Sequence, residues 1–190
     1  PKWIADKGGW ENGKTVEFFD RFVKRVVPQI AEYVDMWVTL NEPGVYMYEI
    51  YIKREWPPAK KGWLGQITTI LNLASAHKKV YQYLHEHYPQ KPIGIAQNVQ
   101  SFAVYHKHSL IEQATVILSD LIANHLFYFL TKNCHDFLGI NYYFHVRFTQ
   151  GKGLLPEVAV ASKESRDVSD LGWEVYPEGL FDVLADLSDG

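Results

Sequence analysis

The alternation of short apolar runs with helix-length amphipathic segments constrains the fold of this chain more than any other feature. The apolar runs are MWVTL, KPIGIAQNV and HDFLGINYYF, at residues 36–40, 91–99 and 135–144. Apolar residues at helical spacing predict helices over residues 15–33, 64–88, 106–130 and 177–187. Pro28 is expected to kink or split the first of them, and residues 41–63 and 149–168 are expected to be loops. Near-continuous apolar strands separated by helices favour an α/β fold with a parallel sheet covered by helices, either a (β/α) barrel or an open doubly wound sheet.

Motifs and composition remove several classes of protein. The sequence lacks both G-x-G-x-x-G and G-x-x-x-x-G-K-[ST], which lowers the weight of the open, nucleotide-binding sheet. A net charge of −3 offers no electrostatic basis for binding nucleic acid or an anionic membrane, and no apolar run is long enough to predict a membrane span. Because Cys134 is the single cysteine and no signal peptide is visible, a cytoplasmic location is expected. We expect residues 1–190 to form one partial domain without an internal boundary, cut from the centre of a longer polypeptide.

Polar side chains stand where each apolar run stops. The first run is followed by Asn41 and Glu42, the second ends in Gln97 and Asn98, and the third carries residues 141–143, Asn-Tyr-Tyr. In a parallel α/β barrel the carboxyl ends of the strands line one mouth, where active sites are built. An amide such as Asn98 is more ordinarily a cap for nearby backbone, whereas a carboxylate at the end of a buried strand costs free energy unless it is paired or used.

Four stretches carry a resemblance to a known family. VTLNEP closely resembles the T-[FL]-N-E-P signature of the family 1 glycoside hydrolases, the retaining β-glucosidases and β-galactosidases. PKWIADKGGW, DFLGINYYF and DLGWEVYPEGL resemble further segments of that family, in family order, so the resemblance covers essentially the whole chain. It implies a (β/α)8 TIM barrel, of which this chain would hold about three βα units, the fourth to sixth strands, with flanking helices.

The resemblance also implies roles for individual residues. Glu42 looks like the general acid/base, and Asn41 is similar to the amide that holds the sugar 2-hydroxyl. Asn141 and Tyr143 match the sixth-strand motif, in which the phenol is expected to hydrogen-bond the nucleophile. Trp173 matches a tryptophan on the leaving-group side of the cleft, and Asn98 is kept as a further substrate-binding candidate because of its place in the second run.

The implied chemistry needs two carboxylates. Glu42 must be protonated when it meets the glycosidic oxygen, and a second carboxylate about 5–5.5 Å away attacks the anomeric carbon. The family's nucleophile motif is not found in this chain, so we expect the nucleophile to lie outside it and the 190-residue piece alone to be inactive. Glu11, in WENG, is rejected as a substitute because no strand-like run leads into it.

The expected substrate is a terminal non-reducing β-D-glucoside or β-galactoside, with no cofactor. No metal is expected, since the histidine pairs 85/87 and 106/108 lack zinc-helix spacing. Two acids follow Trp173: Glu178 is expected to serve a helix dipole, and Glu174 is a weaker candidate for lining the cleft. Two alternatives stay open, a non-catalytic sugar-binding relic and a fragment that associates with the remaining barrel segments or with itself to cover its open edges.

Overall fold

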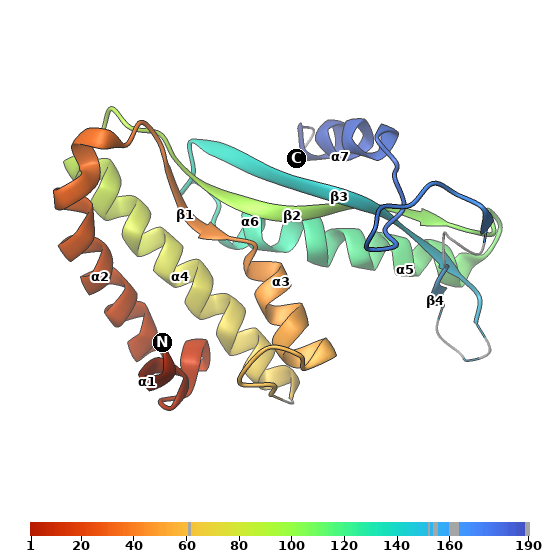
Figure 1. Cartoon of the computed structure of the whole chain (residues 1–190), viewed down its shortest axis with the longest axis horizontal. Helices are drawn as coiled ribbons and strands as arrows, with labels where there is room; N and C mark the ends of the chain where they lie inside the picture. The colour runs from red at the N-terminus through yellow and green to blue at the C-terminus, as the bar shows by residue number, and fades with distance from the viewer. Residues whose placement is uncertain (61, 152, 154–155, 160–163, 189–190) are drawn as a thin grey trace. The chain divides into compact units, whose positions relative to one another are not determined.

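The computed structural model describes residues 1–60, 62–151, 153, 156–159 and 164–188 (Figure 1). The chain divides into two compact units, the first of Pro1–Gln97 with Phe127–Gly139 and the second of Asn98–Leu126 with Ile140–Gly190. Two long strands contribute a segment to each unit. The expectation of one domain without an internal boundary stays a prediction.

The elements follow one another as helix and strand along the chain. In order they are α1 (Lys2–Ala5), η1 (Gly9–Glu11), α2 (Lys14–Ile30), η2 (Ala31–Tyr33), β1 (Trp37–Asn41), α3 (Pro43–Met47), η3 (Tyr48–Lys53), α4 (Trp63–His87), β2 (Ile93–Val104), α5 (Leu110–Asp120), η4 (Leu121–His125), α6 (Leu126–Leu130), β3 (Phe137–Thr149), β4 (Glu157–Val158) and α7 (Glu178–Ser188). Three successive βα units result, led by β1, β2 and β3.

In the first unit, α2 and α4 pack side by side and enclose a hydrophobic core (Figure 1). The core consists of buried aliphatic side chains from α2, η2, α4 and β2, namely Val23, Val27, Ala31, Val80, Leu84 and Ile93. Helix α2 runs through Pro28 and ends two residues later, so the expected split at this proline is wrong, and the expected kink stays a prediction. A proline at this position removes the hydrogen bond to the carbonyl of Lys24, and the helix ends within one turn of it. The rest of the predicted segment forms the 3-10 turn η2.

The strands form a sheet in the order β1-β2-β3-β4. Strand β1 pairs in parallel with β2, with Trp37 opposite Ile93 and Asn41 opposite Ala96. Gly94 lies against Phe137, and Gly139 lies against Ala96. These contacts progress in the same direction along both strands, so β3 runs parallel to β2 in the first unit. Parallel neighbours joined through helices are the arrangement that the apolar runs predicted.

Strands β2 and β3 are longer than predicted. Gln97 and Asn98 lie in the middle of β2, and Asn141 and Tyr143 in the middle of β3, so the expectation that they end their strands is wrong. Alternate residues of β2 stay buried on both sides of these amides, at Ile93, Ile95, Gln97, Val99 and Ser101. The inward-facing row is thus continuous, and a polar residue within it does not stop the strand.

Two expected loops contain regular structure. Residues 43–53 form the helix α3 and the π-helical turn η3, with Pro43 at the first helical position, where its missing N–H costs nothing. Residues 157–158 of the second loop form β4, which pairs antiparallel with β3. Residues 152, 154–155 and 160–163 of that loop lie outside the described part of the chain.

Candidate active site

Glu42 follows the last residue of β1 with a left-handed backbone, at φ 52° and ψ 54°. Few residues other than glycine adopt this conformation, because the side chain crowds the backbone. Here the backbone is held from both sides. The N–H of Glu42 donates to the carbonyl of Ala96 at 2.7 Å, and its carbonyl accepts from the N–H of Tyr46 at 3.2 Å. The chain therefore leaves the strand direction at Glu42, and two backbone hydrogen bonds fix this residue in place. Its side chain is half-buried, and the neighbouring Asn41 is exposed.

His77 of α4 connects β1 to the helix through a side-chain hydrogen bond. The imidazole Nδ1 lies 2.6 Å from the Thr39 hydroxyl, and Nε2 contacts the carbonyl of Cys134. A carbonyl can only accept, so Nε2 carries the hydrogen and Nδ1 accepts from Thr39. The ring is fully buried, and burial lowers the pKa of His77 to about 4. A neutral histidine thus ties the strand that carries Asn41 and Glu42 to the helix layer.

Gln97, the polar residue near the end of the second apolar run, is not predicted as a site residue by the sequence. Its side chain is buried, and its Nε2 lies where a Cβ on Gly44 would come within 3.2 Å. The glycine after Pro43 therefore lets this amide approach the turn that follows Glu42. The sequence signal for Gln97 was a polar residue in an otherwise apolar strand, and it gave no indication of the contact with Gly44.

Glu11, the rejected alternative to Glu42, serves a structural cluster. The Tyr51 hydroxyl donates to its Oε1 at 2.5 Å, and the Lys60 ammonium lies 3.0 Å from its Oε2. Burial alone would raise the pKa of Glu11, but the hydrogen bonds from Tyr51 and Lys60 and the lysine charge hold it below its ordinary value. A carboxylate kept ionised by two donors fastens η1 to η3 and the segment before α4.

Four of the predicted binding residues lie in the second unit. Asn98 Oδ1 accepts from Gln100 Nε2 at 3.0 Å, a contact between same-face neighbours of one strand. Tyr143 and Trp173 come together, with ring centroids 5.9 Å apart at 50°, and both stay partly exposed. Asn141 lies on β3, half-buried, two residues before Tyr143. The structure thus brings together Tyr143 with Trp173 here, and Asn41 with Glu42 in the first unit.

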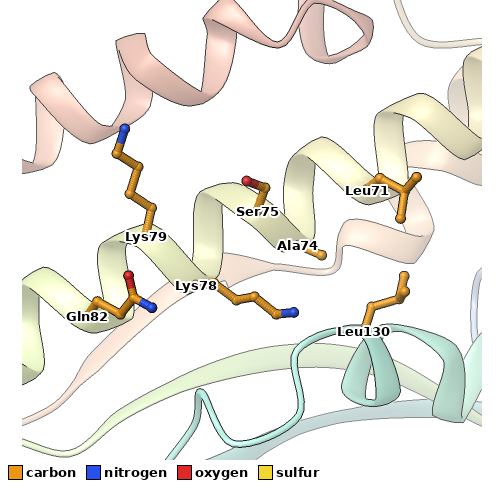
Figure 2. Close-up of a pocket in the computed structure, with 7 residues that line it drawn as sticks. All are labelled: Leu71, Ala74, Ser75, Lys78, Lys79, Gln82 and Leu130. Carbon is orange, nitrogen blue, oxygen red and sulfur yellow. The ribbon is translucent and has the colours of Figure 1, made fainter.

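An open groove in the first unit lies outside these residues. Its volume is about 510 Å³, and it is lined by α4 residues and one residue of α6: Leu71, Ala74, Ser75, Lys78, Lys79, Gln82 and Leu130 (Figure 2). The side chain of Lys79 turns away towards α2, where it pairs with Glu17 at 2.7 Å. None of the predicted site residues lines the groove. Its lining supplies aliphatic groups and ammonium groups, and it lacks the carboxylate that glycoside chemistry requires.

One imidazole and two carboxylates gather in the second unit. His125 Nε2 lies 2.5 Å from Asp186 and 3.3 Å from Asp120. The described residues hold no other group of this kind in which three such side chains could share a metal ion. The contacts join η4 to α7, and exposed groups of this type ordinarily form ion pairs.

Three successive βα units, with a parallel strand that ends in an amide and a carboxylate, are the arrangement of a segment of an α/β barrel. The chain belongs to Glycosyl hydrolase family 1, whose family model matches residues 1–128. A solved hyperthermophilic β-glucosidase from Pyrococcus furiosus has 27% sequence identity and a TM-score of 0.81, over 95% of this chain and 40% of that chain. The resemblance found in the sequence motifs and the TIM-barrel fold class are thereby confirmed.

Two curated relatives differ in the activity that they are named for. The galactolipid galactosyltransferase SFR2, chloroplastic, of Arabidopsis thaliana is 32% identical over 97% of this chain and 30% of its own length. Beta-glucosidase A of Acetivibrio thermocellus is 25% identical over 97% of this chain and 48% of its own length. The chain therefore spans less than half of the length of either relative. Among the described residues, no helix combines the length and apolar character needed to cross a membrane.

Proposed function

We propose that this chain contributes the acid/base half of the active site of a retaining β-glycosidase that hydrolyses terminal β-D-glucosides or β-D-galactosides. Glu42 is the general acid/base, and the nucleophilic carboxylate comes from outside residues 1–190. Membership of the family supports this assignment, as do the β-glucosidase and β-galactosidase names of several relatives.

The observation that carries the proposal is the backbone of Glu42. A carboxylate residue with positive φ at the carboxyl end of a partly exposed parallel strand is strained, and such strain persists where the surroundings enforce it. The bond to Ala96, the following Pro43 and the His77 tie behind β1 supply that enforcement. A structural carboxylate needs no such support, as Glu11 shows within its own ion-pair cluster.

The chemistry takes place in two steps. In the first, protonated Glu42 gives its proton to the glycosidic oxygen while the second carboxylate attacks the anomeric carbon, which releases the aglycone as an alcohol and leaves a glycosyl ester. In the second, Glu42, now a carboxylate, takes a proton from water as the water oxygen attacks the anomeric carbon. This step frees the sugar with its original configuration and restores both carboxyl groups.

The remaining candidates act on the substrate. Asn41 binds the sugar 2-hydroxyl beside Glu42, and Tyr143 hydrogen-bonds the nucleophile. Trp173 lines the leaving-group side, where its partly exposed ring offers an apolar face. Asn141 and Asn98 bind further hydroxyls. The Gln100 contact leaves the Asn98 amide nitrogen as its donor for a ligand.

The test uses the full-length protein that contains this chain, with Glu42→Ala compared against Glu11→Ala. Loss of a general acid costs about 10²–10⁴-fold in rate, and the loss is larger for poor leaving groups that need the proton. Glu42→Ala should thus reduce kcat/KM far more for alkyl β-glucosides than for dinitrophenyl β-glucoside, whereas Glu11→Ala should affect both alike. An equal loss on both substrates in the Glu42 variant would contradict the assignment.

A second candidate function is glycosyl transfer to a sugar hydroxyl instead of water. The name of the Arabidopsis relative, a galactolipid galactosyltransferase, favours it. Glu42 can deprotonate an acceptor alcohol as it does water, so the same residues serve both outcomes. Product analysis with a β-galactoside donor and a galactolipid acceptor separates them, because a transferase lengthens the acceptor and a hydrolase releases free galactose.

Location and assembly remain predictions. The cytoplasm is the predicted location, and the chloroplast is the alternative, because the Arabidopsis relative is described as chloroplastic. Cell fractionation distinguishes the two. Within the described residues β1 pairs on one side only, which supports association with the remaining barrel segments or with another copy. The non-catalytic sugar-binding alternative predicts binding of a β-glucoside without turnover by the full-length protein.

A further inference from the structure

Residues 167–175 form a tight turn, here named the Trp173 turn. The N–H of Ser169 donates to the carbonyl of Trp173 at 2.8 Å, and the N–H of Val175 donates to the carbonyl of Asp167 at 2.9 Å. Gly172 completes the turn with φ +76°, a conformation that disfavours larger residues. These bonds fix the shape of the turn, but they do not fix it to β3.

Apart from the Trp173 ring, the Trp173 turn has almost no apolar anchor. Leu171 is 71% exposed and Val175 57%, and Trp173 itself is 40% exposed. Only Glu174 is buried, at 6%. The rest of the turn buries little apolar area and gains little from the hydrophobic effect, so its attachment also depends on polar contacts.

Glu174 makes those contacts with three cationic or titratable side chains. Its Oε1 accepts a hydrogen bond from Arg166, which precedes the turn. Its Oε2 lies 3.3 Å from His145 Nδ1 and 3.6 Å from Arg147 Nε, both on β3. Arg147 also pairs with Glu164, so the turn and the segment before it converge on the same stretch of β3. Removal of a buried carboxylate that faces two arginines is costly, since it leaves the others unpaired.

Trp173 contacts the same strand through its ring. Its centroid lies 5.0 Å from that of Phe144 and 5.9 Å from that of Tyr143. Glu174 forms an isolated antiparallel bridge with Val168, so the backbone is extended at this point. Successive side chains of an extended backbone point to opposite sides, and a residue anchored inwards therefore fixes the direction of its neighbour.

We propose that Glu174 is a positioning residue that holds the Trp173 ring against Tyr143 and so sets the preference for the leaving group. This inference rests on the proposed function, because it assumes that Trp173 lines the leaving-group side of the glycosidase cleft. It gives the buried ion cluster on β3 a role in specificity. Glu174 acts through Trp173 and does not touch the reacting atoms.

The first measurement is a double-mutant cycle in the full-length protein. Trp173→Ala should lower kcat/KM for an aryl β-glucoside relative to methyl β-glucoside by about three- to tenfold, the size of an aromatic contact. Glu174→Gln, which keeps the shape and removes the charge, should shift the same ratio in the same direction, and it should add no further shift when Trp173 is already alanine. Glu178→Gln, an exposed carboxylate at the start of α7, is the matched control and should leave the ratio unchanged.

The second measurement does not depend on activity. Hydrogen exchange followed by mass spectrometry should show faster exchange of residues 167–175 in Glu174→Gln than in the wild type or in Glu178→Gln. Absence of glycosidase activity in the wild type would overturn the proposed function and leave this readout intact. Unchanged exchange, or an equal loss on both substrates with an unchanged ratio, would overturn the positioning role.

Discussion

Acidification should weaken the attachment of the strand that carries Asn41 and Glu42, because His77 resists protonation in the folded state. The ring is fully buried between Thr39 and the carbonyl of Cys134, and burial lowers its pKa from 6.5 to about 4. Between these two pH values the unfolded chain binds a proton at this histidine and the folded chain does not. The contribution of His77 to the free energy of unfolding is therefore fully present above about pH 6.5. It decreases as the pH is lowered and is lost below about pH 4.

The magnitude follows from the difference in pKa. About 2.5 pH units at about 1.4 kcal/mol each give on the order of 3 kcal/mol for the full transition, of which about 2.5 kcal/mol is lost between pH 7.5 and pH 4.5. That is a large part of the free energy of unfolding of an ordinary domain, about 5–15 kcal/mol. The wild type should thus lose stability steeply between pH 7.5 and pH 4.5. Isolated surface histidines also titrate in this range, but they contribute little to the change in the free energy of unfolding, because their pKa is similar in the folded and unfolded chain.

The assay is urea unfolding followed by circular dichroism at pH 7.5 and pH 4.5. His77→Gln can keep the donor to the Cys134 carbonyl and cannot be protonated, so it should be less stable than the wild type at pH 7.5 yet lose about 2.5 kcal/mol less on acidification. His108→Gln, at an exposed histidine, should retain the wild-type dependence. If wild type and His77→Gln lose stability in parallel, the buried neutral state of this ring is refuted.

Three further outcomes are expected. Glu11→Gln should lower the free energy of unfolding by about 1–2 kcal/mol through its bonds to Tyr51 and Lys60 and leave leaving-group selectivity intact, as thermal melts and kinetics on two substrates can show. Gly94→Ala should destabilise by about 1–3 kcal/mol, because the new Cβ would lie 2.5 Å from the carbonyl oxygen of Phe137; a melting temperature equal to that of the wild type would disprove this packing. Light scattering of the isolated 190-residue chain should show oligomers that cover the open side of β1, and a stable monomer would argue against self-association.

The helices could be predicted from local periodicity, whereas the strand ends could not. The spacing of apolar residues located α4 and α7 to within one residue, because each buries a face that recurs along its own sequence. The sequence predicts strand ends at Gln97 in β2 and Asn141 in β3, because an amide is common just past a strand. Both strands continue because the ladder and the inward-facing row are set by a neighbouring strand, which a single segment does not reveal.

The candidate site also has a part that a local motif predicts and a part that depends on contacts between distant residues. Six consecutive residues, VTLNEP, are enough to predict Glu42 as a site residue because the motif is local, and its role stays a prediction. The His77 tie joins residues 38 and 57 positions apart in the sequence, and the Glu174 cluster brings a late loop onto β3. Contacts of this kind depend on tertiary folding, and no spacing rule along the sequence predicts them.

Rescue of Glu42→Ala by azide tests the central claim most directly. If Glu42 is the acid/base of a retaining enzyme, azide should restore turnover of an activated aryl β-glucoside in the full-length variant, since it attacks the glycosyl ester without needing a base. The product seen by NMR should be the β-glycosyl azide, which retains the configuration of the substrate. No azide response, or an α-glycosyl azide product, would contradict the assignment of Glu42 as the acid/base.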